Sequence, residues 1–276
     1  MNYIVIDDII RKAFEEDFPY GDITTESLIM PEQQLEATLI AKEDGIIAGL
    51  EVFDRVYTLL GDVKCSFLCE DGKSVSKGEK LAAITGNARN ILKGERTALN
   101  FIQRLSGIAS LTNQYVSILS GSNTKLLDTR KTTPGMRYLE KYAVTVGGGI
   151  NHRFGLSDGI LIKDNHIKAV GGIIPAVEMT RKYHGFICKI EVEVENLQMV
   201  QEALDAKADI IMLDNMDEDT IKTAISMING HALTECSGNV DIDRLKILCD
   251  IGVDYISCGA LTHSYSSLDI SLRLVG

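Results

Sequence analysis

Short apolar runs recur through the second half of this 276-residue chain, and each is followed by polar residues and then by a stretch with helical spacing. This alternation predicts a parallel sheet, because parallel strands need long crossover connections that helices usually supply. The near-continuous apolar character of the runs indicates strands that are buried on both faces. The runs cover residues 125–127, 159–162, 187–192, 210–213, 232–234 and 253–256.

The number of these units limits the architecture of the second half. Six or seven of them in roughly 150 residues fit an incomplete parallel α/β barrel better than a complete eight-unit barrel of usual size. A doubly wound open sheet is the alternative arrangement of the same elements. The first half differs, with helical spacing over 6–16 and 91–120 and strand-like segments within 35–50 and 62–86. Gly107 interrupts the helical spacing of 91–120 and predicts two helices there.

Charged and small polar residues stand at the carboxyl end of each predicted strand. In parallel α/β barrels, the side chains that perform catalysis converge at this end. One charged strand end usually marks a solvated turn, but six in succession, with both charge signs, predict a functional site. The residues concerned lie at 128–131, 163–166, 193, 214–215, 235–238 and 257–259.

The segment from Asp128 to Lys168 is basic within an acidic protein. It contains seven Lys or Arg and four acidic residues, together with His152 and His166, whereas the whole chain has a formal net charge of -11. Arg offers a planar fork for carboxylate or phosphate and Lys a point charge, so the cluster predicts a site for several anionic groups. Few aromatic residues interleave with these charges and the chain is acidic overall, so nucleic acid is not expected as a partner.

Loops that contain glycine add two further predictions. Gly147, Gly148 and Gly149 are consecutive, which predicts either close approach of the backbone to a ligand or another chain, or a flexible loop. Loops after the last two strands of a barrel often bind phosphate through backbone N–H groups. Two segments occupy those positions, Ser237-Gly238-Asn239 and Cys258-Gly259-Ala260.

Several classes of protein are disfavoured by the sequence. The N-terminal residues MNYIVIDDII lack the basic region of a secretion signal, and no apolar run approaches the ~18 residues needed to cross a bilayer. The six cysteines are scattered and form no C-x-x-C pair, so free thiols in a reducing cytoplasm are expected. No His/Cys pair has the spacing of a zinc site. These features favour a cytoplasmic enzyme that is not associated with a membrane.

The segment Glu70–Glu79 resembles the edge of a lipoyl or biotinyl domain, because Lys73 and Lys77 lie between turn glycines. Such domains need an exposed lysine at a hairpin tip, within a typical attachment tetrapeptide. That tetrapeptide is missing here, so a structural β-element is the favoured interpretation.

Blocks of residues along almost the whole chain resemble one family. They lie at 21–25, 95–100, 105–109, 128–132, 141–143, 147–153, 161–166, 191–194, 213–215 and 259–264, in this order. In these blocks the chain is similar to quinolinate phosphoribosyltransferase, also called carboxylating nicotinate-nucleotide pyrophosphorylase.

The resemblance implies a fold and a reaction. The fold is an N-terminal α/β sandwich domain, at 1–109, and an open parallel α/β barrel, at 110–276, whose last residues pack back on the first domain. In the reaction, quinolinate attacks the anomeric carbon of phosphoribosyl pyrophosphate (PRPP), and nicotinate mononucleotide, pyrophosphate and CO2 are formed with Mg²⁺, in de novo NAD biosynthesis. Members are homodimers or dimer-based hexamers, with each active site near a subunit boundary.

The resemblance also implies a role for particular side chains. Glu191 and Glu193 share a strand face by their spacing, and only similarity favours Glu193. Asn239 stands where members often have Gly, but Asn tolerates the left-handed backbone that such a loop needs. Quinolinate is expected to contact Arg96, Arg130, His152, Arg153 and Lys163. Lys131 and Lys163 are expected to face the sugar phosphates and pyrophosphate, and the two loops are expected to bind phosphate, at Ser237, Gly238, Asn239 and at Cys258, Gly259, Ala260. Thr129 is expected to contact substrate, Glu193 and Asp214 to bind ribose, Mg²⁺ or both, and Lys42 to reach into the partner's site. The catalytic set is Lys131, Lys163, Glu193 and Asp214.

Three other functions are compatible with parts of this pattern. A nicotinate phosphoribosyltransferase would have only one carboxylate to neutralise, which the full set of basic residues disfavours. A relative in metal or cofactor metabolism with altered chemistry is the second alternative. A non-catalytic barrel that senses phosphometabolites is the third, and Glu193 and Asp214 disfavour it.

Overall fold

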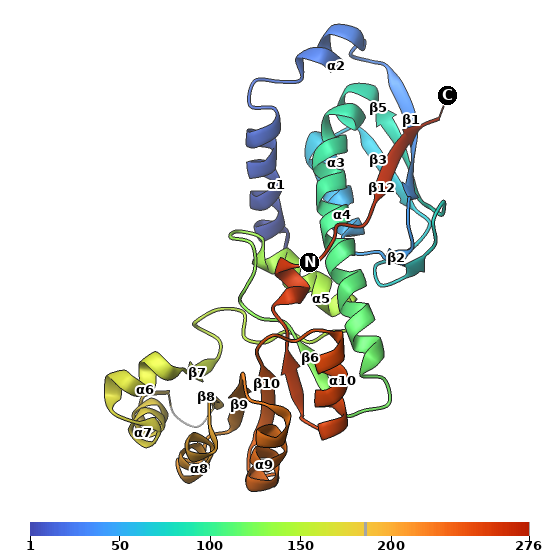
Figure 1. The fold of residues 1–276 in the computed structure, drawn as a ribbon. Helices are drawn as coiled ribbons and strands as arrows, with labels where there is room; N and C mark the ends of the chain where they lie inside the picture. Colours follow the sequence, from blue (N-terminus) through green and yellow to red (C-terminus); the bar gives the residue numbers. More distant parts are fainter. Residues whose placement is uncertain (185–186, 276) are drawn as a thin grey trace. The chain divides into compact units, whose positions relative to one another are not determined.

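The computed structural model describes residues 1–184 and 187–275, which form two compact units (Figure 1). The first unit comprises Met1–Asn113, Thr132–Gly148 and the residues from Thr262 onward. The second comprises Gln114–Lys131 and Gly149–Leu261. Both units are therefore discontinuous in the chain, and the residues from Thr262 onward belong to the first unit.

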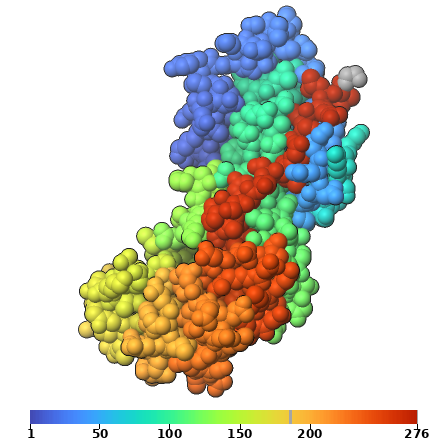
Figure 2. Space-filling model, viewed as in Figure 1, coloured from blue at the N-terminus to red at the C-terminus, as the bar shows by residue number. Residues whose placement is uncertain are grey.

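The first unit is built on a four-stranded antiparallel sheet with helices packed against it. The strand order is β12-β1-β5-β3, so the end of the chain pairs with the first strand. In Figure 2, residues from Thr262 onward run along the surface beside other residues of the same unit. The strands are β1 (Gln34–Ala41), β3 (Val63–Phe67), β5 (Lys80–Asn87) and β12 (Ile270–Leu274), with a separate pair β2 (Gly45–Ile46) and β4 (Ser74–Val75); the helices are α1 (Tyr3–Asp17), α2 (Ile23–Leu28), α3 (Leu50–Leu60), α4 (Ala88–Ile118) and α5 (Arg137–Val146).

The burial pattern of β1 explains this layer. Ala37, Leu39 and Ala41 are buried, and the residues between them are partly exposed, as in a strand with one face on a core. Phe53 and Tyr57 of α3 are fully buried and lie edge to face. Complete burial of Phe53 alone stabilises the unit by roughly 3 kcal/mol. The expected α/β sandwich is confirmed, although no helix was predicted at 50–60.

Gly107 does not interrupt a helix. α4 continues through it for 31 residues. A Cβ on Gly107 would lie 2.2 Å from the Ser266 carbonyl oxygen and 2.9 Å from the Ser267 Cα. The prediction of two helices was wrong, because this glycine allows a neighbouring segment of backbone to pass close to an intact helix.

Gly107→Ala is expected to destabilise the protein even though Ala is the better helix former. The methyl group would overlap main-chain atoms that cannot rotate away, which costs about 1–3 kcal/mol. Urea unfolding followed by circular dichroism measures the change. Gly155→Ala is a milder control, because the nearest atom to a Cβ there is Asp158 Oδ1 at 3.7 Å, an ordinary van der Waals contact. Equal or greater stability of Gly107→Ala would contradict the close approach.

The second unit is a six-stranded parallel sheet with order β6-β11-β10-β9-β8-β7. β6 and β7 are its edges, so within the described residues no strand ladder closes the barrel (Figure 1). The expected open α/β barrel is confirmed. Its strands are β6 (Lys125–Leu127), β7 (Ile160–Ile162), β8 (Ile190–Val194), β9 (Ile210–Asp214), β10 (Leu233–Ser237) and β11 (Tyr255–Ser257); its helices are α6 (Asp164–Val170), α7 (Ile173–His184), α8 (Leu197–Asp205), α9 (Glu218–Ile228) and α10 (Ile242–Ile251), and α11 (Ala260–His263) follows.

Side-chain caps fix where the barrel helices begin. Asn196, Asp217 and Asp241 each accept a hydrogen bond from the backbone N–H three residues later, at the start of α8, α9 and α10. Such caps contribute about 1 kcal/mol each. They set each helix start shortly after the preceding strand, so the strand ends and their polar residues are held on ordered elements.

Two local expectations need correction. The run 187–192 begins as strand only at Ile190, whose N–H donates to the Asp209 carboxylate at 2.8 Å, while Ile187 and Cys188 are exposed. Gly147 does allow a close approach, but to the chain itself, since a Cβ there would lie 2.5 Å from the Ala109 carbonyl oxygen.

All six cysteines, which lie within the described residues, are free thiols as expected. None of the described helices combines the length and apolar character needed to span a membrane.

Candidate active site

Strand pairing places four predicted side chains on one face of the barrel sheet. Residues in register on neighbouring strands point to the same face, and alternate residues along a strand share it. β9 and β10 pair Asp214 with Ser237, and β8 and β9 pair Glu193 with Met212, two residues before Asp214. Lys163 directly follows β7, at the position opposite Glu193. These side chains therefore meet at the carboxyl ends of four adjacent strands.

Each of the two carboxylates at this edge has a polar partner. The Lys163 ammonium forms an ion pair with Glu193. Asp214 accepts hydrogen bonds from the Ser237 hydroxyl and, at 2.8 Å, from the Asn215 amide. All four side chains at the edge are partly exposed, so both carboxylates and the ammonium can also contact a ligand.

The loop after β10 has the backbone that the sequence suggested. Gly238 has φ +93° and Asn239 has φ +47°, so two successive residues are left-handed. A Cβ on Gly238 would lie 2.0 Å from the Asn215 side-chain oxygen, so only glycine fits at this position. Backbone N–H groups in a tight turn can form a concave site for phosphate.

The loop after β11 contains a buried thiol. Cys258 is 2% exposed, and its Sγ lies 3.5 Å from the Val240 carbonyl oxygen. Burial raises the pKa of this thiol, which therefore stays protonated near neutral pH. Cys258 is thus a packing residue, and the role of Gly259 and Ala260 in binding phosphate stays a prediction.

Basic side chains gather from two further segments of the same unit. Arg130 and Lys131 follow β6 and are exposed, and the Thr129 hydroxyl accepts the Lys131 N–H at 3.0 Å. Arg153 donates from Nη1 to the Gly159 carbonyl at 3.1 Å. Burial lowers the pKa of the Arg153 guanidinium, and the nearby charge of Arg130 lowers it further. The nearby carboxylates of Glu191, Asp158 and Glu193 act in the opposite direction and raise this pKa.

His152 lies against two buried carboxylates to which the sequence assigned no individual role. Its Nε2 is 3.2 Å from Glu191 Oε2 and 3.4 Å from Glu235 Oε2. The Glu191 and Glu235 side chains are only 5% and 3% exposed. We call these three residues the His–Glu–Glu cluster. Similarity had favoured Glu193 over Glu191, and Glu235 had been placed beyond a strand that in fact continues to Ser237.

The sequence contains a signal for these carboxylates. Glu191 and Glu193 alternate on β8, as Glu235 and Ser237 do on β10, so each strand directs two polar residues to one face. Acidic residues within strands that are otherwise apolar are rarely buried without a partner. The partner, however, comes from a loop about 40 residues away from Glu191 in the chain, which alternation alone does not reveal.

Burial and the neighbouring charges act on the pKa values of this cluster. Desolvation is the largest influence on Glu191 and raises its pKa to about 7. At His152 desolvation lowers the pKa, whereas hydrogen bonds to Glu191 and Glu235 raise it and outweigh the desolvation. The Arg153 backbone N–H opposes a second proton on the ring, because it donates to His152 Nδ1 at 2.7 Å. The ring proton therefore lies on Nε2.

The His–Glu–Glu cluster is compact enough to hold a metal ion. A histidine that binds a metal through Nε2 usually donates a hydrogen bond from Nδ1–H to an acceptor. Here Nδ1 accepts a hydrogen bond instead, so the Nε2 that faces the carboxylates carries the proton. The contacts therefore favour a hydrogen-bonded cluster over a metal centre.

The remaining predicted residues belong to the first unit. Arg96 lies on α4 and is exposed, and Lys42 follows β1, with its backbone N–H donating to the Asp269 carbonyl at 2.8 Å. Their roles at the active site stay predictions. Arg104, by contrast, forms an ion pair within this unit, donating to the buried Glu140 carboxylate of α5.

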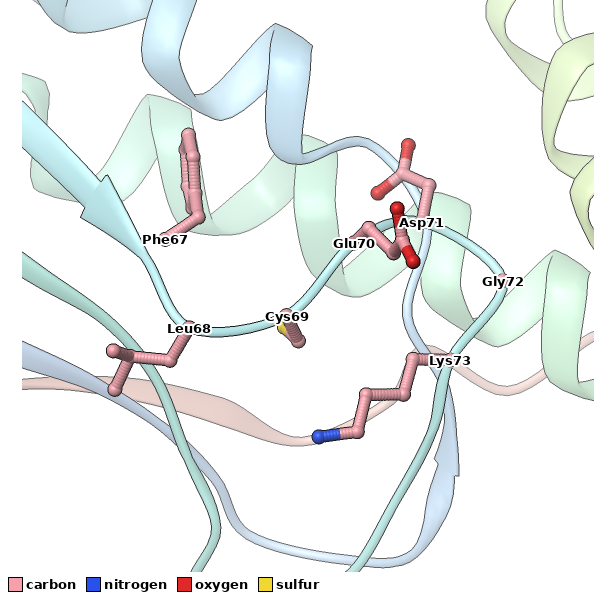
Figure 3. A pocket seen from close by; sticks show the side chains of 7 residues that line it. All are labelled: Phe67, Leu68, Cys69, Glu70, Asp71, Gly72 and Lys73. Carbon is pink, nitrogen blue, oxygen red and sulfur yellow. The ribbon is translucent and has the colours of Figure 1, made fainter.

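Residues 67–73 line a hollow in the first unit, and contacts within that unit hold this segment in place (Figure 3). Asp71 accepts the Gly49 and Leu50 N–H groups at the start of α3, at 2.8 and 3.0 Å, and the Tyr142 hydroxyl at 2.5 Å. Lys73 pairs with Glu79 at 2.6 Å. The neighbouring β4 pairs with β2, so this segment is the structural β-element favoured by the sequence.

Comparison with known proteins identifies the family. The family described as quinolinate phosphoribosyl transferase, N-terminal domain, matches residues 22–106, and its C-terminal domain matches residues 108–273. The chain belongs to the quinolinate phosphoribosyltransferase family. Together the two matches cover nearly all of both units, so the resemblance seen in the sequence blocks is confirmed.

Individual members of the quinolinate phosphoribosyltransferase family resemble the chain over its full length. It is 46% identical to a probable carboxylating nicotinate-nucleotide pyrophosphorylase of Bacillus subtilis, covering 99% of this chain and 94% of that protein. It is 41% identical to a chloroplastic carboxylating nicotinate-nucleotide pyrophosphorylase of Arabidopsis thaliana, over 96% of this chain and 82% of that protein. The solved structure of NadC from Streptococcus pyogenes superposes with a TM-score of 0.95 at 45% identity, covering 100% and 99%.

Proposed function

We propose that this protein transfers the phosphoribosyl group of PRPP to quinolinate and releases nicotinate mononucleotide, pyrophosphate and CO2, as a step of NAD biosynthesis. The observation that carries the proposal is one edge of the barrel sheet. It combines the Lys163–Glu193 ion pair, Asp214 bound to Ser237 and the left-handed backbone at Gly238 and Asn239. Cationic, anionic and phosphate-binding groups meet there, as the two polyanionic substrates require.

The basic side chains bind and orient quinolinate. Arg130 and Arg153 bring two positive charges near each other, so a dicarboxylate is a favourable ligand for the pair. Arg can grip a carboxylate with two parallel hydrogen bonds, which aims the ring nitrogen as well as neutralising charge. With Lys163 supplying a third positive charge, the pyridine nitrogen is held for attack on the anomeric carbon.

The acidic side chains act on the sugar. As pyrophosphate leaves, positive charge develops at the anomeric carbon and its ring oxygen, and the carboxylates of Glu193 and Asp214 stabilise that charge. Lys131 and the loops at Ser237–Asn239 and Gly259–Ala260 bind the phosphate groups. Bond formation leaves a cationic pyridinium ring, which stabilises the electron pair left on the ring carbon as CO2 departs; a proton from water then replaces the lost carboxylate.

Mg²⁺ fits the residues present at this edge. Glu193 and Asp214 offer hard oxygen donors at neighbouring strand ends, and Mg²⁺ is usually held by one or two carboxylates together with substrate phosphates. These two side chains would hold the ion, which would neutralise charge on the pyrophosphate oxygens. We expect chelation by EDTA to abolish turnover and added Mg²⁺ to restore it.

The assembly and location proposed for the enzyme follow the family resemblance. We propose a homodimer, or a hexamer built from three dimers, in which Lys42 of one subunit contributes to the partner's site. The six free cysteines suit a reducing compartment such as the cytoplasm.

The proposed activity is tested by incubating purified protein with PRPP, Mg²⁺ and either quinolinate or nicotinate. Nucleotide and CO2 are followed separately. Equal amounts of both products from quinolinate, and none from nicotinate, are expected. Nucleotide from nicotinate alone would instead show a transferase without decarboxylation, and no nucleotide from either acceptor would contradict the proposal.

The loop after β10 yields a prediction about PRPP. Gly238→Ala places a methyl group on the Asn215 side chain and displaces the loop, so at least one hydrogen bond to a charged phosphate is lost. Such a bond contributes about 1.5–3 kcal/mol, so KM for PRPP is expected to rise about tenfold or more. Steady-state kinetics measure the change. Asn239→Gly is the control and should stay within about twofold, because glycine adopts the same backbone; a KM for PRPP that Gly238→Ala leaves unchanged would contradict the role of the loop.

A further inference from the structure

The two glutamates of the His–Glu–Glu cluster are not needed to stabilise the barrel. Glu191 and Glu235 lie on β8 and β10, on either side of β9, and each directs one oxygen at His152 Nε2. Their other oxygens, Oε1 in both cases, are buried without a hydrogen-bond partner among the described residues. Two nearly unexposed carboxylates in such a place oppose folding, because desolvation of charge costs several kcal/mol for each ion.

Apolar residues would serve stability better at these positions. Replacing a buried ionic group by a well-packed apolar residue of similar volume is often neutral or stabilising. Neighbouring β9 shows that the sheet accommodates apolar residues, since Ile211, Met212 and Leu213 are all buried. The two glutamates therefore have a purpose other than holding the strands together.

The contacts of His152 indicate that purpose. A neutral imidazole carries a proton on one nitrogen and a lone pair on the other. The nitrogen that faces a hydrogen-bond acceptor is the one that keeps the proton. Two carboxylate oxygens face Nε2, so the proton stays there. Nδ1 is then left with its lone pair, which accepts the Arg153 N–H at 2.7 Å.

The same contacts fix the main chain that carries Arg153. The buried Asp128 carboxylate accepts the His152 N–H at 2.8 Å, and the His152 ring accepts the next N–H along the chain. At its far end, the Arg153 guanidinium donates to the Gly159 carbonyl. Arg153 is thus held at its backbone and at its tip, within a loop that has no strand or helix of its own.

We propose that Glu191 and Glu235 are positioning residues, which act through His152 to hold Arg153 in the orientation that binds the dicarboxylate. The inference rests on the proposed function, because Arg153 is assigned to quinolinate there. It also changes the role of His152. The resemblance predicts this residue as a direct ligand of quinolinate, but both of its ring nitrogens already face partners within the protein.

Two double variants distinguish a positioning role of the glutamates from a merely structural role. In Glu191→Leu with Glu235→Leu, the two carboxylates that face Nε2 are removed, so the preference for a proton on Nε2 over Nδ1 weakens. In Glu191→Gln with Glu235→Gln, side-chain carbonyl oxygens still accept that proton, although both charges are gone. The single variant Glu235→Leu is the reserve if the double Leu variant fails to fold.

The first readout is heteronuclear NMR of the histidine ring nitrogens at neutral pH. The signal of His152, one of five histidines, is identified by its loss in His152→Gln. The wild type and the Gln variant are expected to show a neutral ring with its proton on Nε2, and the Leu variant a shift of the proton towards Nδ1. A wild-type ring protonated on Nδ1, or on both nitrogens, would overturn the inference without reference to catalysis.

The second readout is the KM for each substrate. In the Leu variant, KM for quinolinate is expected to rise about tenfold to 100-fold, because small displacements of an orienting group are costly. KM for PRPP and the thermal midpoint should stay close to the wild type, and the Gln variant should recover most of the loss. A residue with a merely structural role would lower stability and affect both substrates together.

The outcomes distinguish this inference from the proposed function. A wild-type protein that turns over no quinolinate would overturn both. An active wild type whose Leu variants keep their KM for quinolinate would overturn the inference alone. A selective rise in KM for quinolinate, with rescue by Gln and the expected change of tautomer, would support it.

Discussion

Glu193→Gln and Asp214→Asn should each lower kcat about 100-fold while leaving quinolinate binding nearly unchanged. Both substitutions keep the shape of the side chain and remove its negative charge. Positive charge develops on the sugar only as pyrophosphate departs, so the carboxylates stabilise the transition state more than the bound substrates; removal of one such group typically costs about 10²–10³-fold in kcat. Single-turnover kinetics with PRPP and quinolinate measure this effect, and calorimetry measures quinolinate binding.

The two variants also report on the neighbouring side chains. Glu193→Gln releases Lys163 from its ion pair, whereas Asp214→Asn leaves that pair intact. Comparable losses in both would assign the effect to the carboxylates themselves. Asp219→Asn is a matched control, since its side chain is 95% exposed and pairs only with Lys222 on the surface of α9. Unchanged turnover in both site variants would contradict the roles assigned to them.

Glu140→Leu is expected to cause the largest loss of stability. The Glu140 side chain is 0% exposed and accepts hydrogen bonds from the Arg104 guanidinium and the Thr133 N–H. Removing one partner of a buried pair leaves the other charge uncompensated, which costs about 3–5 kcal/mol. Denaturant unfolding monitored by circular dichroism measures the change, with the transition tested for two-state behaviour first.

Two control variants show whether burial causes that loss. Glu140→Gln keeps a hydrogen-bond acceptor for Arg104 and should lose clearly less than Leu. Lys12→Ala breaks the exposed Lys12–Asp8 pair on α1 and should cost less than about 1 kcal/mol, because water screens such pairs. A Glu140→Leu variant as stable as Lys12→Ala would show that the Arg104–Glu140 pair contributes little.

Local pattern was sufficient to predict the elements of the barrel. All six apolar runs became strands, because short apolar segments of this kind are stable only when buried in a sheet. The starts of the barrel helices follow from capping residues such as Asp217. Gly107 and the run from residue 187 were misinterpreted because a glycine's neighbours and a strand's first hydrogen bond depend on segments far away in the chain.

Local sequence pattern was also insufficient to predict the charge of the candidate site. Counting residues from Asp128 to Lys168 predicted a basic site, and that segment does supply Arg130, Arg153 and Lys163. The count did not include carboxylates that later strands bring to the same unit. Glu191 and Glu235 lie against His152, and Glu193 pairs with Lys163, so basic and acidic groups alternate within one site.

The sequence by itself determined the fold class, the strand ends that carry chemistry and the backbone tolerance of Gly238 and Asn239. These properties depend on periodicity and on the conformational range of single residues, which are local. Only the tertiary structure decided which carboxylates face His152, which helix Arg104 pairs with and which backbone passes Gly107. Those contacts join residues far apart in the chain, and they form because folding buries polar groups that must then find partners where the packed strands and helices place them.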